Sequence, residues 1–154
     1  MPSAVCIRRF VAMTTQQEIG ILDPATVDRL STAFNDCFSS LDASPDLFSS
    51  DVFFDLYPPL WRFQVQGPDA FVAQLRAIAQ GPTHARILHV TPTATGFVLE
   101  HEESMGGEHP EVARRMWRCE VRDGRITEVV GFCNGGWDDE LRARHAAEAP
   151  MLRP

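Results

Sequence analysis

Residues 114–134 constrain the possible folds of this chain more than any other segment, because apolar and polar side chains alternate on both sides of a tight turn. Before the turn, Trp117 and Cys119 alternate with arginine and glutamate, which is the period-two pattern of a strand with one buried face. The turn itself is Asp123-Gly124, a pair that favours the left-handed backbone of a two-residue hairpin. The segment therefore predicts two long antiparallel strands in a sheet with one apolar face.

The rest of the sequence predicts helices ahead of this hairpin and further strands beside it. Apolar spacing and breaker residues indicate helices over residues 24–41, 45–49, 68–79 and 138–149, and strands over residues 52–57, 60–67, 85–90 and 97–104. This order predicts an α+β fold in which one strongly curved, mixed but mainly antiparallel sheet wraps around the N-terminal helices. The space between sheet and helices is a conical pocket, and such concavities bind small molecules.

Composition limits the possible partners and cofactors. The 154 residues carry a formal net charge of −7, which argues against nucleic acid and against an anionic membrane surface. The four cysteines have no paired spacing, so we expect reduced thiols in a cytoplasmic protein, with no metal and no cofactor. We interpret residues 1–13 as an extension without function, and residues 14–154 as a single domain.

Three segments, residues 47–59 (LFSSDVFFDLYPP), 66–78 (QGPDAFVAQLRAI) and 118–132 (RCEVRDGRITEVVGF), occur in an order that resembles the nuclear transport factor 2-like superfamily. The resemblance is to its polyketide-cyclase-like (SnoaL-like) and ketosteroid-isomerase-like branch. It implies a cystatin-like α+β roll and a homodimer formed through the open face of the sheet. The superfamily contains both enzymes and non-catalytic binding proteins, so the resemblance leaves the activity open.

The catalytic residues of the isomerase do not carry over to this sequence. The position of its general base falls at Leu56, with Asp55 beside it on the opposite face, and its first-helix tyrosine falls at Cys37. Its oxyanion-hole aspartate falls at Trp117. These departures argue against steroid-isomerase chemistry, and the acid–base constellations of an epoxide hydrolase or a dehydratase of this fold are not found either.

The alternation pattern predicts which side chains face the cone. Pairing of adjacent antiparallel strands would bring His101 and Glu103 close to Trp117 and Arg115. A histidine, a carboxylate and an arginine at the mouth of an apolar cone can perform acid–base catalysis, with Tyr57 or Arg115 stabilising negative charge on an oxygen. The alternative is a half-solvated histidine beside an ordinary cross-strand ion pair.

Further residues are candidates for ligand contact. Trp61 and Trp117 are either core residues or stacking walls for a flat ligand, and Gly131 would leave room for one. The full set of candidate ligand-binding residues is Asp55, Trp61, Phe97, Leu99, Trp117, Cys119, Val129, Gly131 and Cys133.

Two main functional hypotheses follow. The first is a small cofactor-independent enzyme of isomerase, cyclase or lyase type that acts on a hydrophobic small molecule, such as a polyketide-like or polycyclic compound. The alternative is a non-catalytic small-molecule-binding or dimeric interaction module of the same fold. In a third hypothesis, the C-terminal residues 151–154 fill the cone and the function lies at a dimer face.

Overall fold

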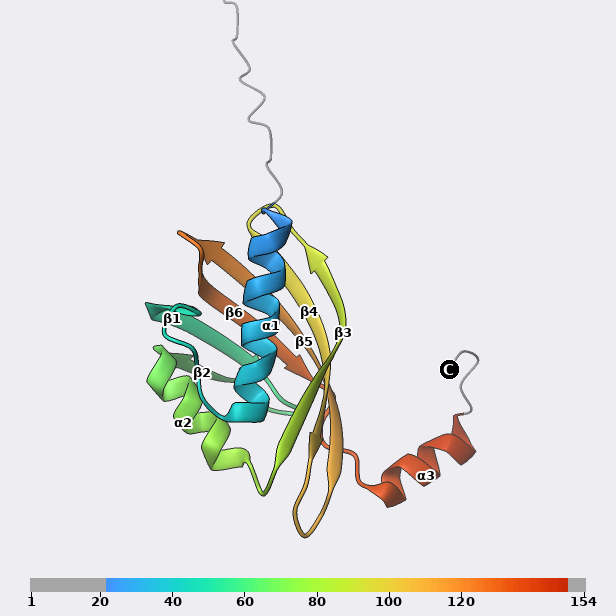
Figure 1. The fold of residues 1–154 in the computed structure, drawn as a ribbon. Coiled ribbons are helices and arrows are strands. Elements are labelled where there is room, and N and C mark those ends of the chain that lie inside the picture. The colour runs from blue at the N-terminus through green and yellow to red at the C-terminus, as the bar shows by residue number, and fades with distance from the viewer. Residues whose placement is uncertain (1–21, 150–154) are drawn as a thin grey trace, which may run out of the picture.

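The computed structural model describes residues 22–149, so the hypotheses on residues 1–13 and 151–154 lie outside the described residues. The elements in chain order are α1 (Pro24–Ser40), β1 (Phe48–Tyr57), β2 (Phe63–Gln66), α2 (Pro68–Ile78), β3 (Thr83–Pro92), β4 (Gly96–Met105), β5 (Glu111–Arg122), β6 (Arg125–Cys133) and α3 (Asp139–Glu148). The sheet carries α1 and α2 on one face, while α3 projects away from it (Figure 1). Among these helices, none is long and apolar enough to cross a membrane.

The sheet has the strand order β2-β1-β6-β5-β4-β3. β1 pairs with β6 in parallel, and the other neighbours are antiparallel. The β5–β6 hairpin turns at Asp123 and Gly124, which both have positive φ, 51° and 72°. The predicted hairpin and the predicted mixed, mainly antiparallel sheet are therefore confirmed.

The cap of α1 stabilises the start of the helix, and the helical spacing of its apolar residues places them on one face, which lies against the sheet. The side chain of Asp23 accepts a hydrogen bond from the Thr26 amide at 3.0 Å, and Pro24 is the first helical residue. The buried residues of the helix include Leu30, Phe34 and Phe38. α1 thus covers the middle of the sheet, as its sequence predicts.

Aromatic side chains fill the narrow part of the cone. Phe54 of β1 and Phe71 of α2 stack with ring centroids 4.1 Å apart. Phe34 of α1 meets the Trp117 ring edge-on at 5.5 Å, and Phe38 lies 5.2 Å from the same indole. The core is therefore continuous from the helices to the sheet, and open space remains toward the mouth of the cone.

Two predicted elements differ from the structure. The helix expected over residues 45–49 is wrong, because the chain turns from Ser44 to Leu47 and β1 then begins at Phe48. The Leu47 carbonyl accepts the Ile126 amide at 2.9 Å, which attaches this segment to β6. The strand expected over residues 60–67 begins at Phe63, because Leu60 adopts a left-handed backbone with φ of 61°.

Candidate functional site

A cavity of about 320 Å³ opens between α2, the end of β1 and the β5 and β6 strands. Most of its lining is apolar, and it includes Leu56, Phe63, Phe71 and Trp117. Arg115 and Glu111 are the charged residues in this lining, so we call it the Arg115 cavity. An apolar cavity with a few convergent polar groups is the usual form of a small-molecule site.

Arg115 of β5 is held by an ion pair with Glu103 of β4. One guanidinium nitrogen lies 2.6 Å from Oε2 of Glu103, and the side chains are 12% and 5% exposed. Burial raises the pKa of Glu103, and the Arg115 guanidinium opposes that rise. Because Arg115 lines the cavity and Glu103 lies behind it, a ligand would contact the guanidinium first.

His101 lies deeper, at the centre of a buried chain of hydrogen bonds. The Trp117 indole N–H donates to His101 Nε2 at 3.0 Å. Nδ1 of His101 lies 3.2 Å from Oδ1 of Asn35, and the Asn35 amide donates to the Ala85 carbonyl at 3.1 Å. Since an indole N–H can only donate, Nε2 is the acceptor and Nδ1 carries the hydrogen.

His101 is therefore neutral, and its fully buried side chain has 0% exposure. Burial, assisted by the charge on Arg115, lowers the pKa of His101 to about 3. Both ring nitrogens are occupied inside the core, so the imidazole has no free position from which to take a proton from a ligand.

The strand pairing brings together the residues that the sequence predicts to meet. His101 lies opposite Arg115 and Leu99 lies opposite Trp117 in the β4–β5 register. The catalytic roles assigned to His101, Glu103, Tyr57 and Arg115 stay predictions. The sequence left open a half-solvated His101, but in the structure its side chain is fully buried.

Seven of the nine candidate ligand-binding residues divide into a lining group and a core group. Trp117, Gly131 and Cys133 line the Arg115 cavity together with Tyr57. The core group is fully buried and consists of Phe97, Leu99, Cys119 and Val129. Burial also raises the pKa of the Cys119 thiol far above its ordinary value, which keeps this thiol protonated.

The space in front of Gly131 is already occupied. A Cβ at this position would overlap Cζ3 of Trp117, whose residue lies directly opposite in the β5–β6 register. Gly131 therefore accommodates the indole of Trp117, where the sequence suggested room for a ligand.

Asp55 and Trp61 lie outside the cavity. Asp55 accepts two hydrogen bonds from Arg62 at 2.9 and 2.8 Å and one from the Tyr57 hydroxyl at 3.1 Å. The Arg62 bonds, with a smaller effect of Tyr57, lower the pKa of Asp55 to about 2. Trp61 is 73% exposed in the turn after the diproline. The Tyr57 hydroxyl is thus bound to Asp55, while the rest of the residue borders the cavity.

Sequence reasoning missed Asn35, Gln74 and Glu111. Asn35 is 7% exposed and interrupts the apolar stripe of α1 directly after Phe34, which is the signal that could have identified it. Gln74 and Glu111 line the cavity, but Glu111 precedes the alternating stretch from which the hairpin was recognised.

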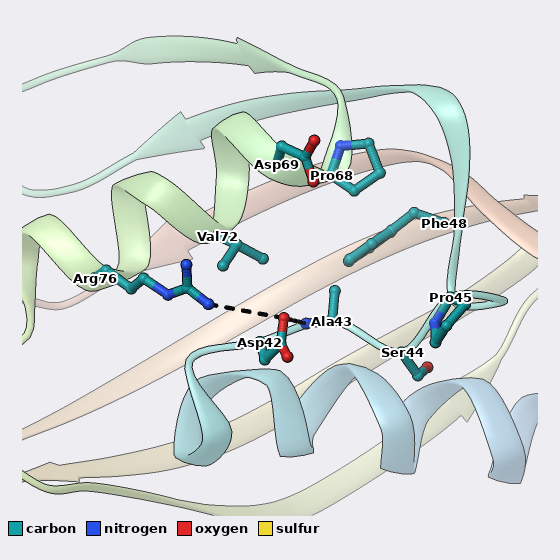
Figure 2. A pocket seen from close by; sticks show the side chains of 9 residues that line it. All are labelled: Asp42, Ala43, Ser44, Pro45, Phe48, Pro68, Asp69, Val72 and Arg76. Carbon is teal, nitrogen blue, oxygen red and sulfur yellow. Dashed lines mark hydrogen bonds and ion pairs between the residues drawn. The ribbon is translucent and has the colours of Figure 1, made fainter.

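A second cavity, of about 390 Å³, lies between the α1–β1 loop and α2 (Figure 2). Figure 2 shows Arg76 of α2 extending toward Asp42 of the loop, and the two charged groups are 3.8 Å apart. Both side chains are well exposed, and Arg76 also donates to the Leu41 carbonyl at 3.0 Å. The lining of this cavity is mostly polar and that of the Arg115 cavity is mostly apolar, so the Arg115 cavity is the better candidate for an apolar ligand.

Comparison with protein-family models gives no match, and comparison with curated protein sequences gives none. Solved structures do match. An LEH-like epoxide hydrolase of M. tuberculosis aligns with a TM-score of 0.59 and 16% identity, over 82% of this chain and 98% of that one. A SnoaL-like protein from Jannaschia sp. CCS1, a candidate polyketide cyclase, aligns with a TM-score of 0.59 and 12% identity, over 84% of this chain and 97% of that protein. A protein of ketosteroid-isomerase-like fold from Catenulispora acidiphila, crystallised with trimethylamine, aligns with a TM-score of 0.53 and 14% identity, over 67% of this chain and 83% of that protein.

Proposed function

The chain has the nuclear transport factor 2-like fold, and on that premise we propose that it binds a small apolar molecule bearing one carboxylate. The observation that carries the proposal is the Arg115 guanidinium in an otherwise mostly apolar cavity. A guanidinium binds oxygen acceptors strongly when water is excluded. The apolar walls would bury the body of the ligand, and Arg115 would fix its orientation.

The ion pair with Glu103 determines which oxygen groups fit. Arg115 is already neutralised by Glu103, so a carboxylate ligand would place a second negative charge beside the same guanidinium. Burial raises the pKa of Glu103, and an incoming anion would raise it further, so that Glu103 takes up a proton as the anion binds. The bound carboxylate then replaces Glu103 as the counter-ion of Arg115, which a neutral amide cannot do.

Matched probes test this proposal. We expect calorimetric titration at pH 6 to give tighter binding of 1-naphthoate than of 1-naphthamide, which has nearly the same shape without the charge. Equal affinity for the two probes, or no binding of either by the folded protein, would contradict the proposal.

Catalysis is a second candidate function, favoured by the raised pKa of Glu103 beside a cation. In this candidate the ligand carbonyl draws the Arg115 guanidinium away from Glu103, so that Glu103 can take a proton from the carbon next to the carbonyl while Arg115 binds the carbonyl oxygen as negative charge develops. His101 does not carry the proton, because both of its ring nitrogens are bonded in the core. The reaction class is then a cofactor-independent isomerisation, cyclisation or lyase reaction of a hydrophobic carbonyl compound.

Hydrogen exchange tests this candidate without knowledge of the natural substrate. We expect the protein in D₂O to accelerate deuterium incorporation into the methyl group of 2-acetylnaphthalene, measured by NMR. Glu103→Gln should lose this activity while His101→Gln keeps it. No acceleration by the wild-type protein, or full activity in Glu103→Gln, would count against catalysis by Glu103.

We also propose that the protein forms a homodimer through the outer face of the sheet. Phe132 and Met116 are 52% and 46% exposed on neighbouring strands, and the Phe132 ring stacks on Tyr57 with centroids 4.9 Å apart. Arg118 bridges Glu120 and Glu128 on the same face. An apolar patch bordered by charged residues suits a protein–protein interface.

A further inference from the structure

Trp117 forms the boundary between the Arg115 cavity and the aromatic core. It lines the cavity, yet it is 3% exposed and packs against Phe34 and Phe38 of α1. Arg115 precedes it by two residues on β5, so both side chains face the same side of the sheet. The indole thus lies next to the proposed oxygen-binding group and closes the cavity on the core side.

Two independent features hold this indole in one position. Its N–H donates to His101 Nε2 at 3.0 Å, and His101 is held in turn by Asn35 at 3.2 Å. The ring also occupies the space in front of Gly131, where even a methyl group would collide with it. A large side chain fixed at both its polar and its apolar edge has little freedom to yield to a ligand.

We propose that Trp117 sets the depth of the Arg115 cavity and selects ligands by size, and that His101 and Asn35 act as positioning residues for its indole. The ligand-selection part rests on the proposed binding function. The depth part does not, because it concerns only the space that the indole occupies. Removal of the indole would extend the cavity toward His101 and expose Nε2.

Chemical complementation tests the depth claim. Trp117→Ala removes the indole, and added free indole is expected to enter from the cavity and to raise the melting temperature of the variant by refilling the space. Trp61→Ala is the matched control, because Trp61 is 73% exposed and its removal leaves no internal space. If indole raises the melting temperature of Trp117→Ala no more than it raises that of Trp61→Ala, the claim is overturned.

Ligand size tests the selection claim. We expect the wild-type protein to prefer 1-naphthoate over pyrene-1-carboxylate, and Trp117→Ala to shift that affinity ratio toward the larger probe by about tenfold or more. If Trp117→Ala does not fold, Trp117→Phe is used, with a smaller shift in the same direction. An unchanged ratio in a folded Trp117 variant would overturn the claim.

The ratio of the affinities for 1-naphthoate and pyrene-1-carboxylate also distinguishes a positioning role of His101 from a purely structural one. His101→Gln retains an acceptor for the indole N–H and is expected to keep the wild-type preference, whereas His101→Leu loses the acceptor and should relax it. Equal ratios in both folded variants would overturn the positioning role. If the wild-type protein binds neither probe, the proposed binding function fails, and the indole experiment still decides whether Trp117 sets the depth.

Discussion

The His101 imidazole shows how burial determines what a side chain can do. Its two nitrogens are fixed by Asn35 and Trp117, and burial lowers its pKa to about 3. The unfolded chain has no such environment, so its histidine titrates near the ordinary value of 6.5. Protonation therefore favours the unfolded state whenever the pH falls below about 6.5.

This difference predicts a pH-dependent stability. A group whose folded pKa is depressed contributes its full stability above about pH 6.5 and loses it as the pH falls toward about 3. Between pH 7.5 and pH 5 the loss from His101 is about 2 kcal/mol of unfolding free energy. Urea unfolding at both pH values measures it.

The appropriate comparison is with His101→Gln, which cannot take up a proton and should lack this contribution. His89→Gln is the control, because His89 is exposed and should behave as the wild-type protein does. If wild type and His101→Gln lose equal stability between the two pH values, His101 is not buried and neutral in the folded state.

The helices α1 and α3 differ in what they contribute to the fold. Both begin at an aspartate whose side chain accepts a backbone amide, Asp23 from Thr26 and Asp138 from Leu141. α1 buries much of its length against the sheet, whereas none of the residues of α3 is buried. The same local cap therefore stabilises a core element in one case and a surface element in the other.

We expect Asp23→Ala to lower the free energy of unfolding by about 1 kcal/mol, and Asp138→Ala to leave it unchanged. Urea unfolding followed by tryptophan fluorescence measures both, and circular dichroism would register the lost helix content of α3. A similar loss in both variants would mean that α3 folds cooperatively with the sheet.

Among the helices and strands, local sequence patterns predict most elements, and non-local contacts determine the exceptions. The Asp123-Gly124 turn and the flanking alternation determine the hairpin, because they act within a few residues. The expected helix at residues 45–49 followed from Pro45, but Leu47 bonds to Ile126 and Phe48 pairs with it in β6. Contacts across nearly eighty residues leave no periodic signal in the sequence.

For the whole molecule, the difference between local patterns and non-local contacts also explains which residues of the candidate site could be predicted from the sequence. His101, Glu103 and Arg115 were predicted to meet because antiparallel neighbours follow from strand order. Asn35 was missed because its partners lie 50 and 66 residues away, on strands that α1 reaches only through the tertiary fold. Trp61 was expected at the cone, but the turn from Pro58 directs it to solvent.

The outer sheet face carries a prediction at this scale. If it forms the homodimer, the protein should have about twice its chain mass of 17.2 kDa in solution, and Phe132→Glu should make it monomeric by placing a charge in the apolar interface. Light scattering after size-exclusion chromatography measures both masses. Leu60→Glu is the control, since Leu60 is fully exposed outside the sheet. A monomeric wild-type protein or a dimeric Phe132→Glu variant would contradict the proposal.

The most direct test of the central claim, that Arg115 binds the carboxylate of an apolar ligand, is calorimetric titration of 1-naphthoate and 1-naphthamide into charge variants. Arg115→Met is combined with Glu103→Gln so that no buried charge is left unpaired. Arg114→Met is the control, because Arg114 is 65% exposed and does not line the Arg115 cavity. We predict that the wild type and Arg114→Met prefer the naphthoate by about tenfold, and that the double variant binds both probes equally. A naphthoate preference that persists in the double variant would contradict the account.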